Sequence, residues 1–261
     1  GRTTLNGEGL QHEDGHSHVQ AGLIPNCVSY DPTYAYELAV ILHSGMKRMY
    51  VDGDKVYYYV TVMNENYSHR EMPKGCEEGI LKGIYLLDTV GDTKAKKKVK
   101  LLGSGTILVQ VREAAKLLSD EFGVTCEVYS VPSFNELGRD GIDCDRFNMR
   151  NPEAKQRVPY ITEVLENGFD GPTVVATDYI KSYADQVRAY VPGAYRVLGT
   201  DGFGRSDSRE NLRRHFEVDA QNIAYASLYE LYKAGDIDAA TLSKAQKALE
   251  IDGNKINPLY A

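Results

Sequence analysis

The sequence lacks any long apolar run, and it contains few cysteines. No stretch approaches the roughly 18 consecutive apolar residues that a membrane-spanning helix needs, and no secretory leader is recognisable. The four cysteines show neither the CxxC spacing of a metal or redox site nor the density of a disulfide scaffold. We interpret them as reduced thiols of a cytosolic protein: Cys27, Cys76, Cys126 and Cys144.

Positive charge is also scarce. The chain has 30 lysines and arginines against 37 acidic residues, a net charge of −7, so no general attraction to nucleic acid or to an anionic membrane is expected. The one basic run, Lys94 to Lys100, lies between a helical pattern and a strand pattern and is typical of a solvated connector. Neither nucleic acid nor a membrane is therefore expected as a partner.

Ionisable side chains gather instead in one glycine-containing loop, Asn6 to Gln20, which has no helical or strand periodicity. It contains His12, His16, His18, Glu8, Glu13 and Asp14. Imidazole has an unperturbed pKa of about 6.5, which suits proton transfer near neutral pH or stabilisation of a developing anion. The residues alone leave open a catalytic loop, a polar surface loop or a metal site. The turn signal Asp14-Gly15 weakens the metal alternative, because two histidine ligands at i, i+4 require a helix.

Before residue 64 the pattern predicts two strands and one helix, too few for a covered sheet. We expect buried strands at Ile24–Ser29 and Val56–Val62, and a helix over Thr33–Tyr50 that contains a structural His43. The apolar side of this helix is predicted to be Ala35, Leu38, Ala39, Leu42, Met46 and Met49. A polar, aperiodic segment, Asn64–Gly75, marks a domain boundary.

After this boundary strands and helices alternate, which predicts a three-layer α/β/α domain with a mostly parallel sheet. The expected strands are Val99–Leu102, Cys126–Val131, Thr173–Thr177 and Tyr195–Leu198. The expected helices are Glu77–Leu87, Ile107–Phe122, one from Ser133 that ends before a polar loop at Arg146–Arg157, Tyr160–Glu166, Ile180–Tyr190, Ser208–Glu217, Asn222–Ala234 and Ala239–Glu250.

Two glycine-rich turns are further candidates for binding. Gly103-Ser104-Gly105 resembles the start of a dinucleotide fingerprint, but Leu108 replaces its third glycine, and a steric role is the alternative. Gly199–Asn211 follows a strand and ends in the capping-box spacing Asp207-x-x-Glu210. It is predicted to be either a capped tight turn or an anion site, or to place Arg205 and Arg209 in ion pairs across a subunit interface.

The chain opens as GRTTLNGEG, inside the loop that carries the candidate chemistry and without an initiator methionine. We therefore expect it to be the C-terminal piece of a longer polypeptide.

Four segments together resemble one family: HEDGHSH in the loop, YDPTYAYELAVILHSGMKRMY from Tyr30, MNENY from Met63, and YRVLGTDGFGRSDSRENLRRHFEVD from Tyr195. The family is the homodimeric, bacterial-type pyruvate dehydrogenase decarboxylase component, a thiamine-diphosphate enzyme of the transketolase-like superfamily. The resemblance extends along essentially the whole chain, to the final NPLYA. It implies that residues 1–74 are the end of a pyrimidine-binding α/β domain and that residues 75–261 are a transketolase-like C-terminal domain.

The resemblance also implies an activity and a set of partners. Such an enzyme uses thiamine diphosphate and Mg²⁺ to decarboxylate pyruvate, and it reductively acetylates lipoyl groups of the dihydrolipoyl acetyltransferase core. It would be a cytoplasmic bacterial homodimer within a multienzyme complex. The family's GDG…N motif for Mg²⁺ and diphosphate is not in this sequence, nor is the glutamate that activates the aminopyrimidine. The resemblance therefore predicts that this chain alone is inactive and contributes no cofactor-binding or metal-binding residue.

Within the loop, the family's active-site glutamate and histidine match Glu8 and His12. The histidine pattern of transketolases instead selects His18, so His12 ranks first, His18 second and His16 third. One alternative is a transketolase that transfers ketol units between sugar phosphates, although this loop offers no basic groups for phosphate other than imidazoles. Another is that residues 75–261 act only in dimerisation or partner docking.

Overall fold

The structure, a computed structural model, describes residues 1–261 and contains two sheets. The larger sheet has five strands in the order β3-β5-β4-β6-β7. All neighbouring pairs are parallel except β3–β5, which is antiparallel. The strands are β3 (Tyr85–Val90), β4 (Lys98–Gly103), β5 (Thr125–Ser130), β6 (Thr173–Ala176) and β7 (Tyr195–Leu198).

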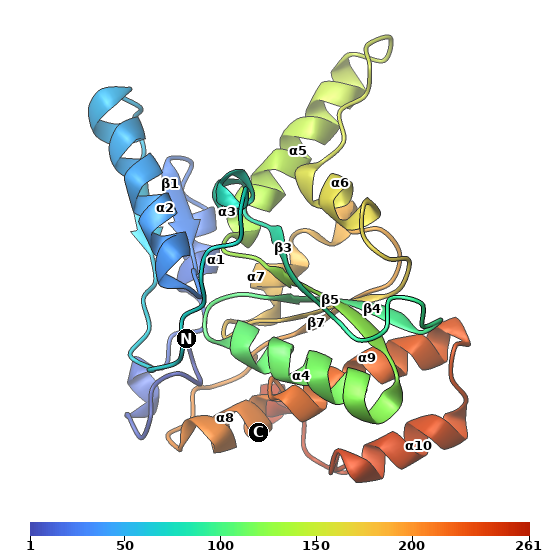
Figure 1. Ribbon diagram of the computed structural model, residues 1–261. Helices are drawn as coiled ribbons and strands as arrows, with labels where there is room; N and C mark the ends of the chain where they lie inside the picture. The colour runs from blue at the N-terminus through green and yellow to red at the C-terminus, as the bar shows by residue number, and fades with distance from the viewer.

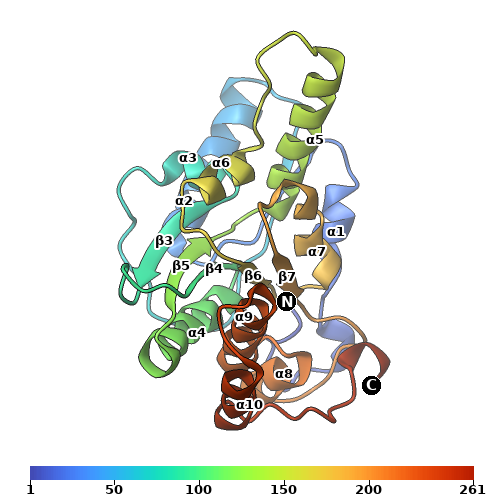
Figure 2. The same ribbon diagram turned by 90° about the vertical axis from the view of Figure 1, so that its right-hand side faces the viewer.

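Helices cover both faces of this sheet, which confirms the predicted three-layer arrangement (Figures 1 and 2). One face carries α4 (Ile107–Phe122), α8 (Arg209–Phe216), α9 (Ala220–Ala234) and α10 (Ala239–Ala248). The other carries α5 (Phe134–Arg150), α6 (Tyr160–Glu166), α7 (Lys181–Asp185) and the 3-10 helix η3 (Arg188–Tyr190). No helix of the protein combines the length and the apolar character that a bilayer crossing requires.

The two faces of the sheet are separate cores because side chains alternate along each strand. Leu101 on β4 and Val174 on β6 belong to the core beneath α4 and α9. Their successors Leu102 and Val175 belong to the second core, beneath α5 and α7. Apart from Lys98 at the start of β4, every residue of the two strands is buried, as expected for parallel strands with helices on either side.

The smaller sheet pairs β1 (Cys27–Tyr30) with β2 (Tyr57–Val60) in parallel. It packs beside α1 (Ser17–Gly22), α2 (Ala35–Met46) and the π-helix η2 (Lys47–Val51), and α2 and α5 project from the body of the molecule (Figure 1). The segment that follows β2 forms no helix or strand until α3 (Glu77–Lys82).

Buried carboxylates join this N-terminal part to the larger sheet. Glu37 on α2 accepts hydrogen bonds from Tyr85 on β3 and Ser130 on β5, both at 2.6 Å. Asp178, just after β6, accepts from the Thr3 backbone N–H at 2.9 Å and from the Thr4 hydroxyl at 2.5 Å. Because each buried acceptor is satisfied by donors from the other part, separating the two parts would leave these polar groups unpaired.

The predicted helix Glu77–Leu87 is too long, and β3 was not foreseen. The helix ends at Lys82 because Gly83 adopts φ 104°, a left-handed C-cap conformation. A Cβ at this glycine would lie 2.4 Å from the Ser133 carbonyl oxygen. The chain then continues as β3, the antiparallel edge of the sheet. Further along, α5 runs to Arg150, into the region predicted as a loop.

The apolar side predicted for the 33–50 helix is not the side that is buried in the structure. The residues buried on α2 are Glu37, Ile41 and Gly45, whereas Leu42 and Met46 are 47% and 54% exposed. Gly45 allows a close approach of α2 to β2, since a Cβ there would lie 3.1 Å from the Tyr58 ring. His43 is exposed rather than structural, and β2 is only partly buried.

Candidate active-site loop

The loop Asn6–Gln20 folds into two short helical turns joined by an acidic cap. The first is the 3-10 helix η1 (Leu10–His12), and the second is α1. The Asp14 carboxylate accepts hydrogen bonds from the backbone N–H groups of His16 at 2.9 Å and Ser17 at 3.0 Å. Burial opposes ionisation of Asp14, but these hydrogen bonds and the one from the Ser17 hydroxyl lower its pKa. Asp14 therefore fixes the turn between the histidines.

The loop histidines occupy two different environments. His12 lies on η1 and is exposed, as are Glu8 and His16. His18 is completely buried. Its ring is stacked on that of Tyr183, with the ring centroids 4.9 Å apart, and lies edge-on to the Tyr179 ring, with the centroids 4.6 Å apart. The three histidines therefore do not converge on one point, and no group of three or more His, Cys, Asp or Glu side chains in the chain could hold a metal ion.

His18 belongs to a buried hydrogen-bonded relay. Its Nε2 lies 3.0 Å from the Thr61 hydroxyl, which donates to Asp31 at 2.8 Å. Because the Thr61 hydroxyl donates its only proton to Asp31, it must accept a hydrogen bond from His18. The proton of the neutral imidazole is therefore on Nε2. Burial lowers the pKa of His18 to about 3 and raises the pKa of Asp31 to about 6. His18 is therefore neutral at physiological pH.

The buried imidazole gives a testable pH dependence. Because the pKa of His18 is lower in the folded chain than the ordinary value of about 6.5, its stabilising effect is present above pH 6.5 and is lost as the pH falls toward 3. Relative to His18→Gln, the unsubstituted chain should lose about 2 kcal/mol of unfolding free energy between pH 7 and pH 5. Urea unfolding at pH 7 and at pH 5 measures this difference. The raised pKa of Asp31 changes stability in the opposite direction, but it does so in both proteins and therefore largely cancels. His43→Gln, at an exposed position, is the control, and an identical pH dependence in all three proteins would contradict the assignment.

The stretch Gly199–Asn211 is the structural support of the loop. The Gly7 N–H donates to the Asp207 carbonyl at 3.0 Å, and the Arg205 N–H donates to Glu13 Oε2 at 2.8 Å. These two contacts lie on either side of the segment that carries Glu8 and His12. Arg209 adds a hydrogen bond from its Nε to the Thr4 carbonyl at 2.6 Å. These three hydrogen bonds join the Gly199–Asn211 stretch to the loop and the segment before it within one chain.

Details of that stretch differ from prediction. Ser208, not Asp207, is the N-cap of α8, and its hydroxyl accepts from the Asn211 N–H at 3.3 Å. Arg209 lies 3.8 Å from Glu65 of the same chain, and Arg205 donates to the carbonyl oxygens of Gly204 and Ala261. Within this chain both arginines already have partners, and ion pairs across a subunit interface stay a prediction.

The Gly103-Ser104-Gly105 turn is filled by a side chain. The Ser104 hydroxyl donates to Asp31 at 2.8 Å, and the Gly105 N–H donates to the Asp31 carbonyl at 3.0 Å. A Cβ on Gly105 would lie 2.6 Å from the Asp31 carboxylate. Since a buried carboxylate lies where the phosphates of a dinucleotide would approach, the steric role of these glycines is the one observed.

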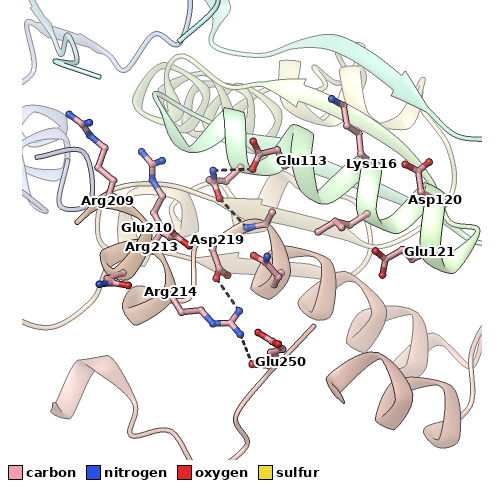
Figure 3. Close-up of a pocket in the computed structure, with 15 residues that line it drawn as sticks. Glu113, Lys116, Asp120, Glu121, Arg209, Glu210, Arg213, Arg214, Asp219 and Glu250 are labelled. Atoms are coloured by element: carbon pink, nitrogen blue, oxygen red, sulfur yellow. Dashed lines mark hydrogen bonds and ion pairs between the residues drawn. The ribbon is translucent and has the colours of Figure 1, made fainter. Parts of the chain in front are cut away.

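Two surface cavities lie near these elements. One, which we call the loop cavity, has a volume of about 560 Å³ and is lined by Arg2, Leu10, Glu13, Asp201, Phe203 and Leu259, among others. The other, of about 790 Å³, lies between α4, α8 and the start of α9 and is lined almost entirely by charged and polar groups (Figure 3). Its arginines are largely paired, for example Arg214 with Asp219 at 3.0 Å.

The sequence alone assigns no role to two residues that anchor the loop and the segment before it, Glu13 and Asp178. Glu13 was placed in the loop but not given a function, and Asp178 was not singled out. Asp178 lies two residues after the end of the buried strand β6, and a polar residue near the carboxyl end of such a strand is the signal that could have identified it.

Comparison with known proteins gives consistent matches. The family model for the pyruvate dehydrogenase E1 component middle domain matches residues 1–70, and the model for the transketolase-like TK C-terminal domain matches residues 83–219. The pyruvate dehydrogenase E1 component of Escherichia coli (strain K12) is 59% identical over 263 residues, which cover 100% of this chain. That of Pseudomonas aeruginosa is 55% identical over 260 residues, or 99% of the chain. The chain spans 29% of the length of either relative.

Among solved structures, transketolases share the fold at low identity. A transketolase mutant from Pichia stipitis has a TM-score of 0.62 and 18% identity, covering 89% of this chain and 29% of that chain. The transketolase of Campylobacter jejuni has a TM-score of 0.61 and 17% identity, covering 86% and 29%. The chain therefore belongs to the transketolase-like C-terminal domain family, and it is similar over essentially its whole length to pyruvate dehydrogenase E1 components.

Proposed function

We propose that this chain is the C-terminal part of a thiamine-diphosphate-dependent pyruvate dehydrogenase. The whole enzyme would decarboxylate pyruvate and reductively acetylate the lipoyl groups of a dihydrolipoyl acetyltransferase. The observation that carries this proposal is the 59% identity to a pyruvate dehydrogenase E1 component over the full chain. In this proposal residues 1–74 end the pyrimidine-binding domain and residues 75–261 form the C-terminal domain.

Glu8 and His12 are the residues we assign to the reaction, with His18 and His16 ranked after them. His12 is exposed on η1, where an imidazole can hold the carboxylate of pyruvate and take part in proton transfer. Glu8 is exposed on the same loop and can accept a hydrogen bond from substrate. For His18, burial supports a structural role over contact with substrate.

The residues of this chain do not fit the diphosphate and Mg²⁺ end of the cofactor. No three potential ligands converge as a metal site, and carboxylates rather than cations dominate the loop cavity, where Glu13 and Asp201 would repel a diphosphate. We therefore assign binding of thiamine diphosphate and Mg²⁺ mainly to residues outside these 261. The chain alone is expected to bind the cofactor weakly and to release no CO₂.

The proposal assigns the whole enzyme to a cytoplasmic homodimer within a multienzyme complex. Its first test is an assay of the full-length enzyme with thiamine diphosphate and Mg²⁺, in which CO₂ release from pyruvate is compared with turnover of xylulose phosphate. Pyruvate is the expected substrate. Turnover of xylulose phosphate alone would assign the enzyme to the transketolase alternative. If neither substrate reacts, the non-catalytic docking alternative for residues 75–261 would extend to the whole protein.

The isolated chain supplies an independent control. Isothermal titration of the 261-residue chain with thiamine diphosphate and Mg²⁺, followed by a decarboxylation assay on the same sample, should show neither micromolar binding nor CO₂. Micromolar binding with turnover would contradict the assignment of the cofactor to other parts of the enzyme.

A further inference from the structure

The loop cavity contains a buried carboxylate with one oxygen unsatisfied. Glu13 is 6% exposed, and its Oε2 accepts the Arg205 N–H at 2.8 Å. Its Oε1 is buried and has no hydrogen-bond partner. A buried polar atom without a partner costs about 1–3 kcal/mol, and more if the group is charged. Such an atom in the wall of a cavity therefore indicates a ligand that donates a hydrogen bond.

The charges around the cavity favour a positively charged donor. Four carboxylates surround Arg2, namely those of Asp14, Asp201, Glu13 and Asp178. The other nearby cations are Lys181, 3.6 Å from Asp201, and the amino group of Gly1. The Arg2 guanidinium is directed at backbone carbonyls, with Nη1 donating to Thr200 O at 2.6 Å. Of the side chains that line the cavity, Glu13 and Asp201 are carboxylates, Arg2 is a guanidinium and His16 is an imidazole. A metal ion does not suit the site, because no three ligands converge there.

The rim of the cavity is apolar. Leu10, Phe203 and Leu259 line it and are 55%, 74% and 46% exposed. They come from three separate segments, η1, the Gly199–Asn211 stretch and the 3-10 helix η4 (Pro258–Tyr260). An apolar group that bridged them would remove hydrophobic surface from water at roughly 25 cal/mol per Å². The ligand should therefore combine a cationic nitrogen with an aliphatic or aromatic body.

We propose that the loop cavity binds an organic ammonium ion, whose N–H group donates to Glu13 Oε1 and whose apolar body packs against Leu10, Phe203 and Leu259. The site adjoins the candidate catalytic loop, because His16 also lines the cavity and Glu13 follows His12 directly in the chain. Occupancy would hence stiffen the loop. The proposal depends on the contacts around Glu13 and not on the activity assigned above.

The test uses 3-methylbutylammonium chloride as the probe and the 261-residue chain as the receptor, with binding followed by calorimetry or by amide chemical shifts. A dissociation constant on the order of a millimolar is expected for so small a ligand. The neutral isostere 3-methylbutan-1-ol should bind at least about 10-fold more weakly, because it lacks the charge that pairs with Glu13.

Two variants and one control locate the site. Glu13→Gln keeps an oxygen for the Arg205 N–H but presents an NH₂ donor in place of Oε1, so amine binding should weaken at least about 10-fold. Phe203→Ala changes an exposed residue that the fold does not need, and it should weaken binding by about 3- to 10-fold through lost apolar contact. Glu153→Gln, at an exposed carboxylate on another loop, should leave binding unchanged. Equal affinity for amine and alcohol, or full binding in both site variants, would overturn the proposal.

Discussion

Replacing His12 by alanine in the full-length enzyme should lower kcat/KM for pyruvate by about 10²-fold, because general acid–base residues typically raise a reaction rate by 10²–10⁴-fold. The loss should appear as a raised KM or as slower reductive acetylation. The free energy of unfolding should change by no more than about 0.5 kcal/mol, because the side chain is exposed on η1. Steady-state kinetics with pyruvate, and single-turnover acetylation of a lipoyl domain, measure the two quantities.

His43→Ala is the matched control for that experiment. It removes an exposed imidazole from α2, outside the loop, and both kinetics and stability should remain unchanged. His16→Ala then separates the loop positions, since His16 is also exposed but ranks below His12. Unaltered kinetics in His12→Ala would remove this residue from the reaction. A loss in His16→Ala alone would transfer the role to His16.

The parts of the fold that were predictable are those whose pattern is local. The bounds of α4 agree with prediction at both ends, because its apolar residues repeat at helical spacing and Gly123 terminates it at φ 60°. The bounds of α6 and β7 also agree. In each case the sequence itself carries the periodicity and the termination signal.

The incorrect predictions have a different cause: the burial of these side chains is determined by partners that are distant in the sequence. Glu37 is buried on α2 because Tyr85 and Ser130, 48 and 93 residues away, donate hydrogen bonds to it. Helical periodicity assigns such a carboxylate to solvent, and the apolar side that it predicts for α2 is not the side that is buried. No local signal shows that a charged side chain will find two donors from another sheet.

In the candidate site, too, local features were predictable from the sequence and distant contacts were not. The loop and the Gly199–Asn211 stretch were each identified from composition, as clusters of ionisable residues and glycines. Their mutual contact was not, because the hydrogen bond between Arg205 and Glu13 joins residues 192 positions apart. The burial of His18 was also not predictable, since its cage comes from Thr61, Tyr179 and Tyr183 in other elements.

The contact between loop and stretch leads to the second large effect, at Gly204. A Cβ on this residue would lie 2.7 Å from the Leu10 carbonyl oxygen and 3.1 Å from the Glu13 Cβ. The first of these neighbours is backbone and cannot rotate away. Alanine at this position must therefore push η1, and His12 with it, away from the stretch that supports the loop.

Gly204→Ala in the full-length enzyme should lower kcat/KM for pyruvate by between about 10- and 100-fold, because a displacement of about 1 Å is enough to cost 10²-fold in rate. The loss of unfolding free energy should be about 1–3 kcal/mol, the usual range for an overpacked site. Steady-state kinetics and denaturant unfolding on one preparation measure both.

Gly253→Ala is the matched control, since the nearest atom to its added Cβ is Gln246 Nε2 at 3.1 Å, the movable end of a flexible side chain. It should alter neither rate nor stability appreciably. If Gly204→Ala lost stability but kept its kcat/KM, the stretch would serve the fold alone and the geometry of the loop would not limit the reaction. If it lost activity while remaining folded, the C-terminal domain would act on the reaction through the backbone position of η1, although the proposed catalytic residues belong to the preceding domain.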